Sequence, residues 1–180
     1  MTELARAVFT RLDAMGIPYE FIEHPAVHTI EDCAAENVIP GAVVAKNYFL
    51  TTKNRKRFFL CLVRPEARFR TADISRQAET SRLSFAGEDD MLARLRVRPG
   101  AVSPMALMFD EAAEVELLVD GALRSMDRLA FHPCDNTCTL AMGAADFFGH
   151  FLPALNRAPR FVEIHDFLAQ RFPPDSRFFP

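Results

Sequence analysis

The segment FHPCDNTCTL, residues 131–140, carries one histidine and two cysteines within a short stretch of chain. His132, Cys134 and Cys138 could ligate a metal ion, could pair a thiol nucleophile with its base, or could simply belong to a strand and its turn. A structural zinc site needs four ligands, which commonly come as two pairs. The other two cysteines of the chain stand singly, without a CxxC partner. The ligand set is therefore incomplete, and a zinc site stays open only as an alternative.

Thiol catalysis is the second chemistry that this segment could support. A cysteine nucleophile needs a nearby base and a lowered thiol pKa. Cys134 and His132 could meet the first requirement. Cysteine is, however, also a common small buried hydrophobe, and nothing else in the segment completes a triad. We therefore favour a structural role for the cysteines.

Lys46 stands inside the apolar run AVVAKNYFL. A lysine that faces inward is costly to bury unless it has a partner or a purpose, whereas a lysine that points outward from an edge strand is commoner. The segment GAVSP, residues 100–104, is a loop punctuated by glycine and proline. Such a loop could turn backbone N–H groups toward an anion or a carbonyl oxygen. The chain has no Walker loop and no GxGxxG, GxSxG or HExxH motif.

Positive charge is clustered along the chain. The formal net charge of −3 argues against a protein that coats nucleic acid, but it leaves room for a local patch that docks on RNA. Lys53, Arg55, Lys56 and Arg57 follow one another almost directly, and charge alone favours a solvated hairpin tip there. Two further groups consist of arginines: Arg64, Arg68 and Arg70, then Arg94, Arg96 and Arg98.

The composition is that of an ordinary globular protein. With 180 residues, 49% of them hydrophobic and 25% charged, the chain is long enough for one domain with a substantial core. The opening MTELARAVFTRLDAMG lacks the apolar stretch of a signal peptide, and no run is long enough to span a bilayer. Four cysteines, Cys33 and Cys61 among them, then predict reduced thiols and a cytoplasmic protein.

Short helices and strands alternate along the chain. Thr2 and Gly16 can cap a first helix with apolar residues at helical spacing, and Ala42–Thr52 and Arg57–Arg64 read as two strands of a hairpin. The same patterns predict further helices near 29–36, from Thr71 or Asp73, at 87–95 and at 144–155. They also predict a strand from Ile17 that ends at His24-Pro25, and further strands near 84–85, 115–119, 129–131, 137–142 and 160–164. Asp120-Gly121 is a strong turn signal. This mixture predicts a mixed sheet with flanking helices, and no linker divides it.

Several of these stretches, taken together, resemble the YbaK-like prolyl-tRNA editing family of aminoacyl-tRNA deacylases, and most closely its free-standing PrdX/ProXp branch. The specific combination is a strand lysine followed by asparagine, then G-x-V-S-P, then H-P-x-x-N-x-x-T. The matching segments are EHPAVHTIED (23–32), AKNYFL (45–50), RPGAVSPMALMFD (98–110), VELLVDGAL (115–123) and FHPCDNTCTLAMGAADFFGHFL (131–152).

The resemblance implies a single α/β (α+β) domain with a mixed, strongly curved, barrel-like sheet and flanking helices. We expect this domain to span residues 1–165, with 166–180 as a C-terminal tail packed on it. The resemblance also implies hydrolysis of the ester that joins a wrong amino acid to tRNA, without a cofactor or a metal. Cys134 and Cys138 fall on positions that the family motif leaves variable, so the family gives them no catalytic role.

Site residues follow from the same resemblance. It implies that Lys46, His132 and the loop residues Gly100, Ala101 and Ser103 form the catalytic set. The substrate-binding set that it implies is His28, Thr29, Asn47, Val102, Pro104, Met105, Asn136 and Thr139. An aminoacyl ester is already activated, so water attack needs positioning and oxyanion stabilisation more than a strong nucleophile. We expect backbone N–H groups of 101–103 to hold the carbonyl oxygen and His132 to orient water or a ribose hydroxyl.

Departures from the family pattern bear on specificity. Where the family often reads P-F-G-L-I-N-D, this chain reads PMALMFD over residues 104–110. A small pocket there suits alanine, so mischarged alanyl-tRNA(Pro) is the first expected substrate and cysteinyl-tRNA(Pro) the second. Lys53, Arg55, Lys56 and Arg57 are then expected to contact acceptor-stem phosphates. Prolyl-tRNA synthetase is a further expected partner, whereas DNA and membranes are not. A non-catalytic module that binds tRNA or a synthetase is the alternative from another class.

Overall fold

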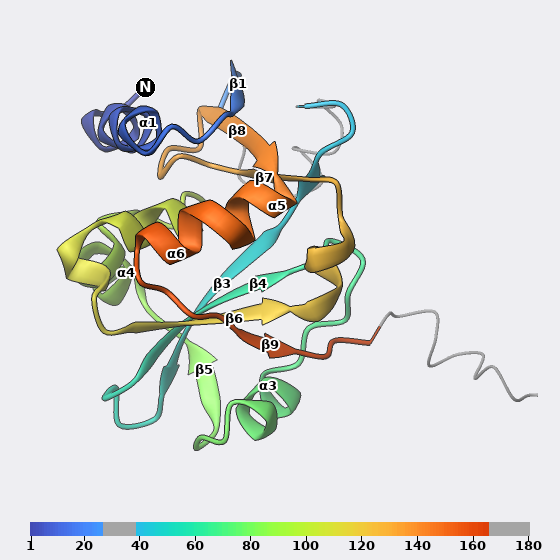
Figure 1. The fold of residues 1–180 in the computed structure, drawn as a ribbon. Helices are drawn as coiled ribbons and strands as arrows, with labels where there is room; N and C mark the ends of the chain where they lie inside the picture. Colours follow the sequence, from blue (N-terminus) through green and yellow to red (C-terminus); the bar gives the residue numbers. More distant parts are fainter. Residues whose placement is uncertain (27–38, 166–180) are drawn as a thin grey trace, which may run out of the picture.

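Two β-sheets form the frame of the protein in the computed structural model, which describes residues 1–26 and 39–165 (Figure 1). The four-stranded sheet has the order β1-β8-β7-β2, and the five-stranded sheet has the order β5-β3-β4-β6-β9. Both sheets contain parallel and antiparallel pairs. The strands are β1 (Glu20–Glu23), β2 (Val43–Val44), β3 (Lys46–Thr52), β4 (Phe58–Val63), β5 (Leu83–Phe85), β6 (Val115–Asp120), β7 (Arg128–Phe131), β8 (Cys138–Gly143) and β9 (Arg160–Val162).

Between β2 and β3 the chain runs directly from the first sheet into the second. β2 runs parallel to β7 in the first sheet, and Ala45 then leads the chain directly into β3 of the second sheet. The backbone N–H of Ala45 still bonds to the carbonyl of Ala130 at 3.4 Å, so the sheets separate at this residue. The apolar run that contains Lys46 is therefore the segment in which the chain passes from the first sheet to the second.

Helices cover the sheets at several places. The first helix, α1, begins after Thr2, whose hydroxyl accepts from the N–H of Ala5 at 3.2 Å, and ends at Gly16 with a φ of 65°. This is the capping that the sequence predicts. The helical segments are α1 (Glu3–Met15), α3 (Thr71–Gln77), α4 (Glu88–Leu95), η1 (Pro104–Met108), η2 (Asp110–Ala112), η3 (Gly121–Ser125), α5 (Ala144–Asp146), η4 (Phe147–Phe151) and α6 (Leu152–Ala154). None of the helices in the described ranges is long and apolar enough to cross a membrane.

The core is divided by the second sheet. One face of that sheet, with Phe49 and Leu60, packs in a large cluster that includes residues of α1, η1 and η4. The other face, with Leu50 and Phe59, packs against Ile74 of α3 in a smaller cluster. Successive residues of a strand point to opposite faces, so every second residue of β3 belongs to each cluster.

The structure confirms the predicted fold class, a single α+β domain with mixed sheets, although both described sheets are open. Some boundaries differ from the predictions. The strand predicted from Ile17 to the His24-Pro25 step begins later, at Glu20, and ends at Glu23. The helix predicted at 144–155 is interrupted by a π-helical turn over Phe147–Phe151. Pro153 follows closely and has no N–H to donate to the preceding turn, which favours a wider turn at this point. The helix predicted near 29–36 and the tail 166–180 lie outside the described residues.

Candidate active site

The parallel pairing of β2 and β7 brings Lys46 and His132 to the same end of the first sheet. Val43 pairs with Leu129 and Val44 pairs with Ala130. Lys46 and His132 each follow two residues beyond the last of these pairs, so continuing the register aligns the two residues. Parallel strands that end together open a crevice at their carboxyl ends, a common place for ligands. Two residues 86 positions apart (132 − 46) in sequence thus follow the same strand pair, at the point where the sheets separate.

The neutral imidazole of His132 is held with one nitrogen fixed. Its Nδ1 lies 2.9 Å from the carbonyl oxygen of Cys138, which can only accept, so Nδ1 carries the proton and donates. Burial lowers the pKa of His132, and the positive charge of nearby His24 lowers it further, against the raising effect of the Cys138 carbonyl. At neutral pH the ring is therefore uncharged and its Nε2 is an acceptor. An acceptor nitrogen of this kind can orient a water molecule or a hydroxyl group.

His24 is a member of this cluster that the sequence analysis did not select. Its Nδ1 lies 2.8 Å from the Pro25 carbonyl, and its Nε2 lies 2.9 Å from Oγ1 of Thr139. Thr139 Oγ1 is also 3.4 Å from Nδ1 of His132, and the two imidazole centroids are 5.9 Å apart. The pairing of β1 with β8 makes this contact, because it sets Glu23 opposite Cys138 and so brings the next residue, His24, to the turn. Thr139, predicted to bind substrate, thus lies between the two imidazole rings.

Asp135 fixes the turn that follows His132. Its carboxylate accepts from the N–H and the hydroxyl of Thr137 at 3.0 and 2.7 Å, and from the N–H of Thr2 at 2.6 Å. Burial alone would raise the pKa of Asp135, but these hydrogen bonds lower it to about 2. The link to Thr2, 133 residues away, was not visible in the sequence. Asn136, predicted to bind substrate, lies half-buried in this turn.

The two cysteines of the motif are buried and protonated. Burial raises the pKa of the Cys134 thiol far above its usual value, and burial raises that of Cys138 to about 11. Neither is a thiolate at neutral pH, in agreement with the structural role favoured for them. Within residues 1–26 and 39–165, no three His, Cys, Asp or Glu side chains are grouped so that they could hold a metal ion.

Lys46 and Asn47 point to opposite faces of β3. Asn47 shares its face with Ala45 and Phe49, which belong to the large core cluster, whereas Lys46 shares its face with Tyr48. Oδ1 of Asn47 is buried and has no hydrogen-bond partner, and it is the sole side-chain atom of the described residues in that condition. A buried acceptor without a partner costs about 1–3 kcal/mol, so such an atom points to a missing donor.

The loop at residues 100–104 holds backbone donors on a firm support. Gly100 has a φ of 88°, a conformation that favours glycine. The N–H of Ala101 is used in a turn to Arg98, and the hydroxyl of Ser103 accepts from the N–H of Met105 at 3.2 Å, so these two groups stabilise the loop itself. The N–H groups of Val102 and Ser103 have no acceptor among the residues that the structure describes. They are the donors of this loop that no described residue uses, although Ser103 has no exposed surface and Val102 keeps 9% exposure.

The side chains behind this loop are sealed. Pro104, Met105 and Ala106 are buried, and the last two have no exposed surface, so they support the loop rather than line open space. Ala101 and Val102 keep 8% and 9% exposure and lie in the same core cluster as Ala45, Phe131 and Cys134. Met105, predicted to border the amino-acid pocket, is thus fully buried and lies in the same core cluster as Ala101 and Val102.

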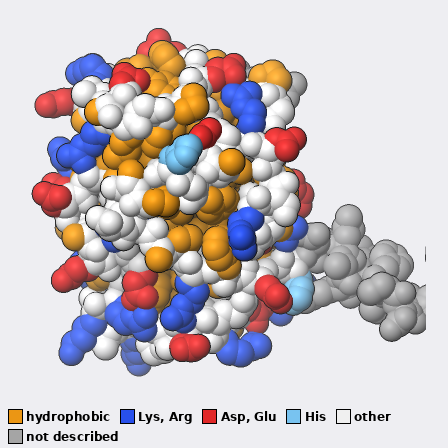
Figure 2. All heavy atoms as spheres, in the orientation of Figure 1, with side chains coloured by type: hydrophobic (Ala, Val, Ile, Leu, Met, Phe, Trp, Pro, Cys, Tyr) orange, Lys and Arg blue, Asp and Glu red, His pale blue; other side chains and the backbone are white. Residues whose placement is uncertain are grey.

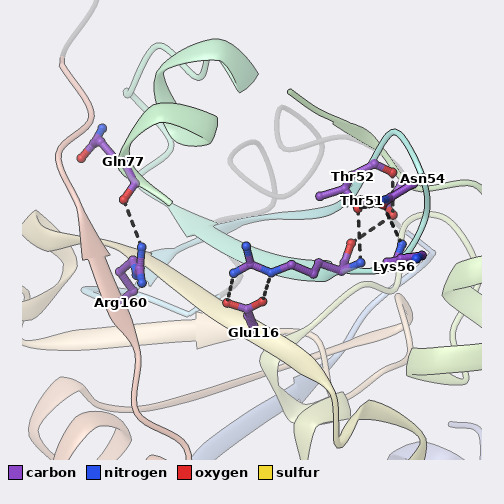
Figure 3. A network of polar contacts seen from close by, with 8 residues as sticks. Thr51, Thr52, Asn54, Lys56, Gln77, Glu116 and Arg160 are labelled. Atoms are coloured by element: carbon purple, nitrogen blue, oxygen red, sulfur yellow. Dashed lines mark hydrogen bonds and ion pairs between the residues drawn. The ribbon is translucent and has the colours of Figure 1, made fainter. Parts of the chain in front are cut away.

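The predicted RNA-binding cluster lies at the far end of β3. The turn after Thr52 is closed by its hydroxyl and by Asn54 (Figure 3), and it is six residues, or about 20 Å, from Lys46. Arg57 donates to both carboxylate oxygens of Glu116 at 2.7 and 2.8 Å, and Arg55 pairs with Asp90 at 2.7 Å. Lys53 and Lys56 are exposed. The remaining predicted site residues, His28 and Thr29, lie outside the described residues.

Comparison with known proteins identifies the family of this chain. The family model for the aminoacyl-tRNA editing domain matches residues 24–148, which include every site segment above. The prolyl-tRNA editing protein ProX of Acetoanaerobium sticklandii is 32% identical over 141 residues, 78% of this chain and 86% of its own. The prolyl-tRNA synthetase associated domain-containing protein 1 of Danio rerio is 33% identical over 150 residues, 82% of this chain and 80% of its own.

A solved structure gives the same result for the fold. A protein described as a candidate trans-editing enzyme for prolyl tRNA synthetase superposes with a TM-score of 0.69 at 15% identity, over 92% of this chain and 99% of its own. The resemblance seen in the sequence is thus confirmed for the family and for the fold. The chain belongs to the aminoacyl-tRNA editing domain family.

Proposed function

We propose that this protein hydrolyses the ester bond of mischarged tRNA(Pro), with alanyl-tRNA(Pro) as its preferred substrate. The observation that carries the proposal is the unpaired, buried Oδ1 of Asn47, at the strand end that the β2–β7 register shares with His132. Family membership supplies the reaction class, and the names of the relatives point to prolyl-tRNA.

The residues divide the work between binding and chemistry. Asn47 Oδ1 accepts a hydrogen bond from the α-ammonium group of the aminoacyl ester. Lys46, on the other face of β3, contacts the phosphate of the terminal nucleotide. This division follows from strand alternation, because consecutive side chains cannot reach the same side of the sheet. Lys46 therefore serves as a positive charge for binding rather than as the base.

The chemical step needs a positioned water molecule and a stabilised oxyanion. Nε2 of neutral His132 accepts a hydrogen bond from the water or from the adjacent ribose hydroxyl, and the water adds to the ester carbonyl carbon. The N–H groups of Val102 and Ser103 stabilise the negative oxygen of the tetrahedral intermediate. Its collapse breaks the bond to the ribose oxygen, which takes up the proton that the water gave up. The products are the free amino acid and tRNA with both ribose hydroxyls restored.

Selection against the cognate amino acid rests on size. Ala101 and Val102 are the slightly exposed part of the loop, and fully buried Met105 holds them in place. A pocket of this kind distinguishes substrates by only about 1–3 kcal/mol per methylene group, so exclusion of the larger proline is easier than tight recognition of alanine. A hydrolytic sieve needs only this exclusion.

The experiment is a deacylation panel with alanyl-, cysteinyl-, seryl- and prolyl-tRNA(Pro). We expect release of alanine to be fastest and release of proline to be at background. Lys46→Ala should abolish release while the circular dichroism spectrum and unfolding midpoint stay unchanged. Arg6→Ala, which removes an exposed positive charge on α1 outside the predicted RNA-binding cluster, is the control. Near-normal turnover by Lys46→Ala would refute the role of Lys46. Binding without turnover of any substrate would favour a non-catalytic module instead.

A further inference from the structure

An exposed aromatic cluster lies on the same face of β3 as Lys46. The rings of Tyr48 and Phe69 are 4.1 Å apart between centroids, and that of Phe85 lies 5.7 Å from Tyr48 and 6.1 Å from Phe69. Phe85 is 60% exposed, more than any other large hydrophobic side chain of the described residues. An exposed phenylalanine stacked in a cluster is an unusual use of a residue that normally contributes to the core.

The sheet itself places these rings together. β5 pairs with β3 so that Phe85 lies opposite Leu50, and the diagonal neighbour of Phe85 on the same face is Tyr48. Phe69 comes from the segment before α3 and covers the pair. Tyr48 is two residues, or about 7 Å, from Lys46 and four residues, or about 14 Å, from the hairpin turn after Thr52. The cluster therefore lies between the candidate active site and the basic turn.

Arginines flank this cluster. Phe69 stands between Arg68 and Arg70, both exposed, and these two arginines line a cleft of about 290 Å³ together with Arg76. Acidic groups are present as well: Asp73 and Glu163 line the same cleft, and Glu88 and Asp89 lie beyond Phe85 in a separate groove. On the face seen in Figure 2, Lys and Arg side chains gather along the lower edge, where Figure 1 places β5, α3 and the β3–β4 turn.

A second aromatic cluster in the same molecule provides an internal comparison. Phe9, Tyr19 and Phe21 have centroids 4.9–6.4 Å apart, and Phe21 is 46% exposed. Their charged neighbours are acidic, however: the Tyr19 hydroxyl bonds to Asp13 at 2.9 Å, and Glu20 and Glu23 flank the strand. The two clusters thus have similar rings, but arginines adjoin Phe69 in the first, whereas acids adjoin Tyr19 and Phe21 in the second, where Arg128 pairs with Glu20 at 2.8 Å.

We propose that Tyr48, Phe69 and Phe85 form a stacking platform for the unpaired nucleotides next to the 3′ end of the RNA substrate. Single-stranded RNA is bound by aromatic rings that stack on bases, with arginines nearby that contact phosphates. The platform holds the penultimate bases while Lys46 receives the terminal nucleotide, and the duplex lies toward the hairpin turn. The inference rests on the proposed function in that it takes the 3′ end of tRNA as the occupant.

The test uses RNA that carries no amino acid, so that its outcome does not depend on ester hydrolysis. The RNA is a hairpin with a single-stranded ACCA overhang, in which 2-aminopurine replaces the first adenine of the overhang. It is titrated with the protein, and a blunt hairpin with the same stem is titrated for comparison. We expect quenching of the fluorophore and tighter binding of the overhang. Phe85→Ala should weaken overhang binding about 5- to 150-fold, the fold-change that corresponds to stacking of one base. Binding of the blunt hairpin should not change.

Phe21→Ala is the control, because it removes an exposed ring from the second aromatic cluster, and it should leave both affinities unchanged. Phe85→Tyr keeps a stacking ring and should restore binding. Equal affinities of native protein and Phe85→Ala for the overhang, or an equal loss in Phe21→Ala, would overturn the platform. Sedimentation that changes in Phe85→Ala without RNA, while RNA binding stays constant, would assign the cluster to self-association instead. If the native protein binds the overhang as expected but deacylates no mischarged tRNA, the result would count against the proposed function alone and not against the platform.

Discussion

Asp135 links the chain start to the turn that carries His132, and its charge gives a direct measure of that link. Asp135→Asn keeps the shape of the side chain and removes the charge. It also replaces one accepting oxygen with an N–H₂ group. Thr137 can keep its bonds to the remaining oxygen, but the N–H of Thr2, now 2.6 Å from Oδ2, would then face another donor. The variant therefore breaks the long-range half of the network.

The magnitude follows from the pKa of Asp135. Burial opposes ionisation, but the hydrogen bonds prevail and lower the pKa from 3.8 to about 2. A difference of this size corresponds to about 2 kcal/mol of stability at neutral pH. Because the folded protein binds this proton more weakly than the unfolded chain, the contribution is complete above the unfolded pKa and is lost as pH falls through the folded one. About half of it should remain at pH 3.

The assay is urea unfolding of the native protein and Asp135→Asn at several pH values between 7 and 2.5. We expect the variant to be less stable by about 2 kcal/mol at pH 7, with a difference that shrinks steadily below pH 4. Glu66→Gln, at an exposed carboxylate, should show a difference near zero throughout. A difference below about 0.5 kcal/mol at pH 7, or one that does not change with pH, would refute the reasoning, because a charged, bonded carboxylate must give both effects.

Three further predictions concern the site and its approach. Asn47→Leu removes an unpaired buried acceptor, so the free energy of unfolding should stay unchanged or rise by about 1 kcal/mol. The same variant should release alanine at least tenfold more slowly. A clear loss of stability in urea unfolding would show that Oδ1 has a partner. Because the pKa of His132 is lowered, its neutral form persists at pH 7. The rate should therefore fall as the pH is lowered, with a midpoint below the ordinary histidine pKa of 6.5. The unfolding midpoint should fall over the same acid range, because the unfolded chain binds the proton more readily there. His132→Gln should remove this acid limb of the residual rate, and an unchanged profile would exclude His132. The double variant Lys53→Ala, Lys56→Ala should reduce the slope of log K for RNA binding against log salt concentration by up to about two units. Arg57→Gln should change this slope little, because the charge of Arg57 is already paired with Glu116. An unchanged slope in the double variant would mean that the turn is only solvated.

Local patterns in the sequence were enough to predict most elements of the fold and the family of the chain. Capping residues and periodicity act over a few residues, and the first helix and the hairpin of β3 and β4 form where those signals predict them. The combination of Lys46, the 100–104 loop and the motif at His132 was sufficient to indicate the family, since residue types at fixed spacing are a property of the sequence itself.

Contacts between distant segments were decided by the tertiary structure alone. The three groups of positive charge looked alike in sequence, but Arg64 pairs with buried Asp120, Arg55 and Arg57 pair with acids, and Arg94 lies 3.8 Å above the ring of Phe58. His24 joins His132 only because β1 pairs with β8, and no local rule encodes that pairing. Strand alternation likewise separates Lys46 from Asn47, but only the packing of the two faces shows which of them meets the core. Sequence spacing therefore named the chemical groups, whereas strand register, a non-local property, determined which partners each group has.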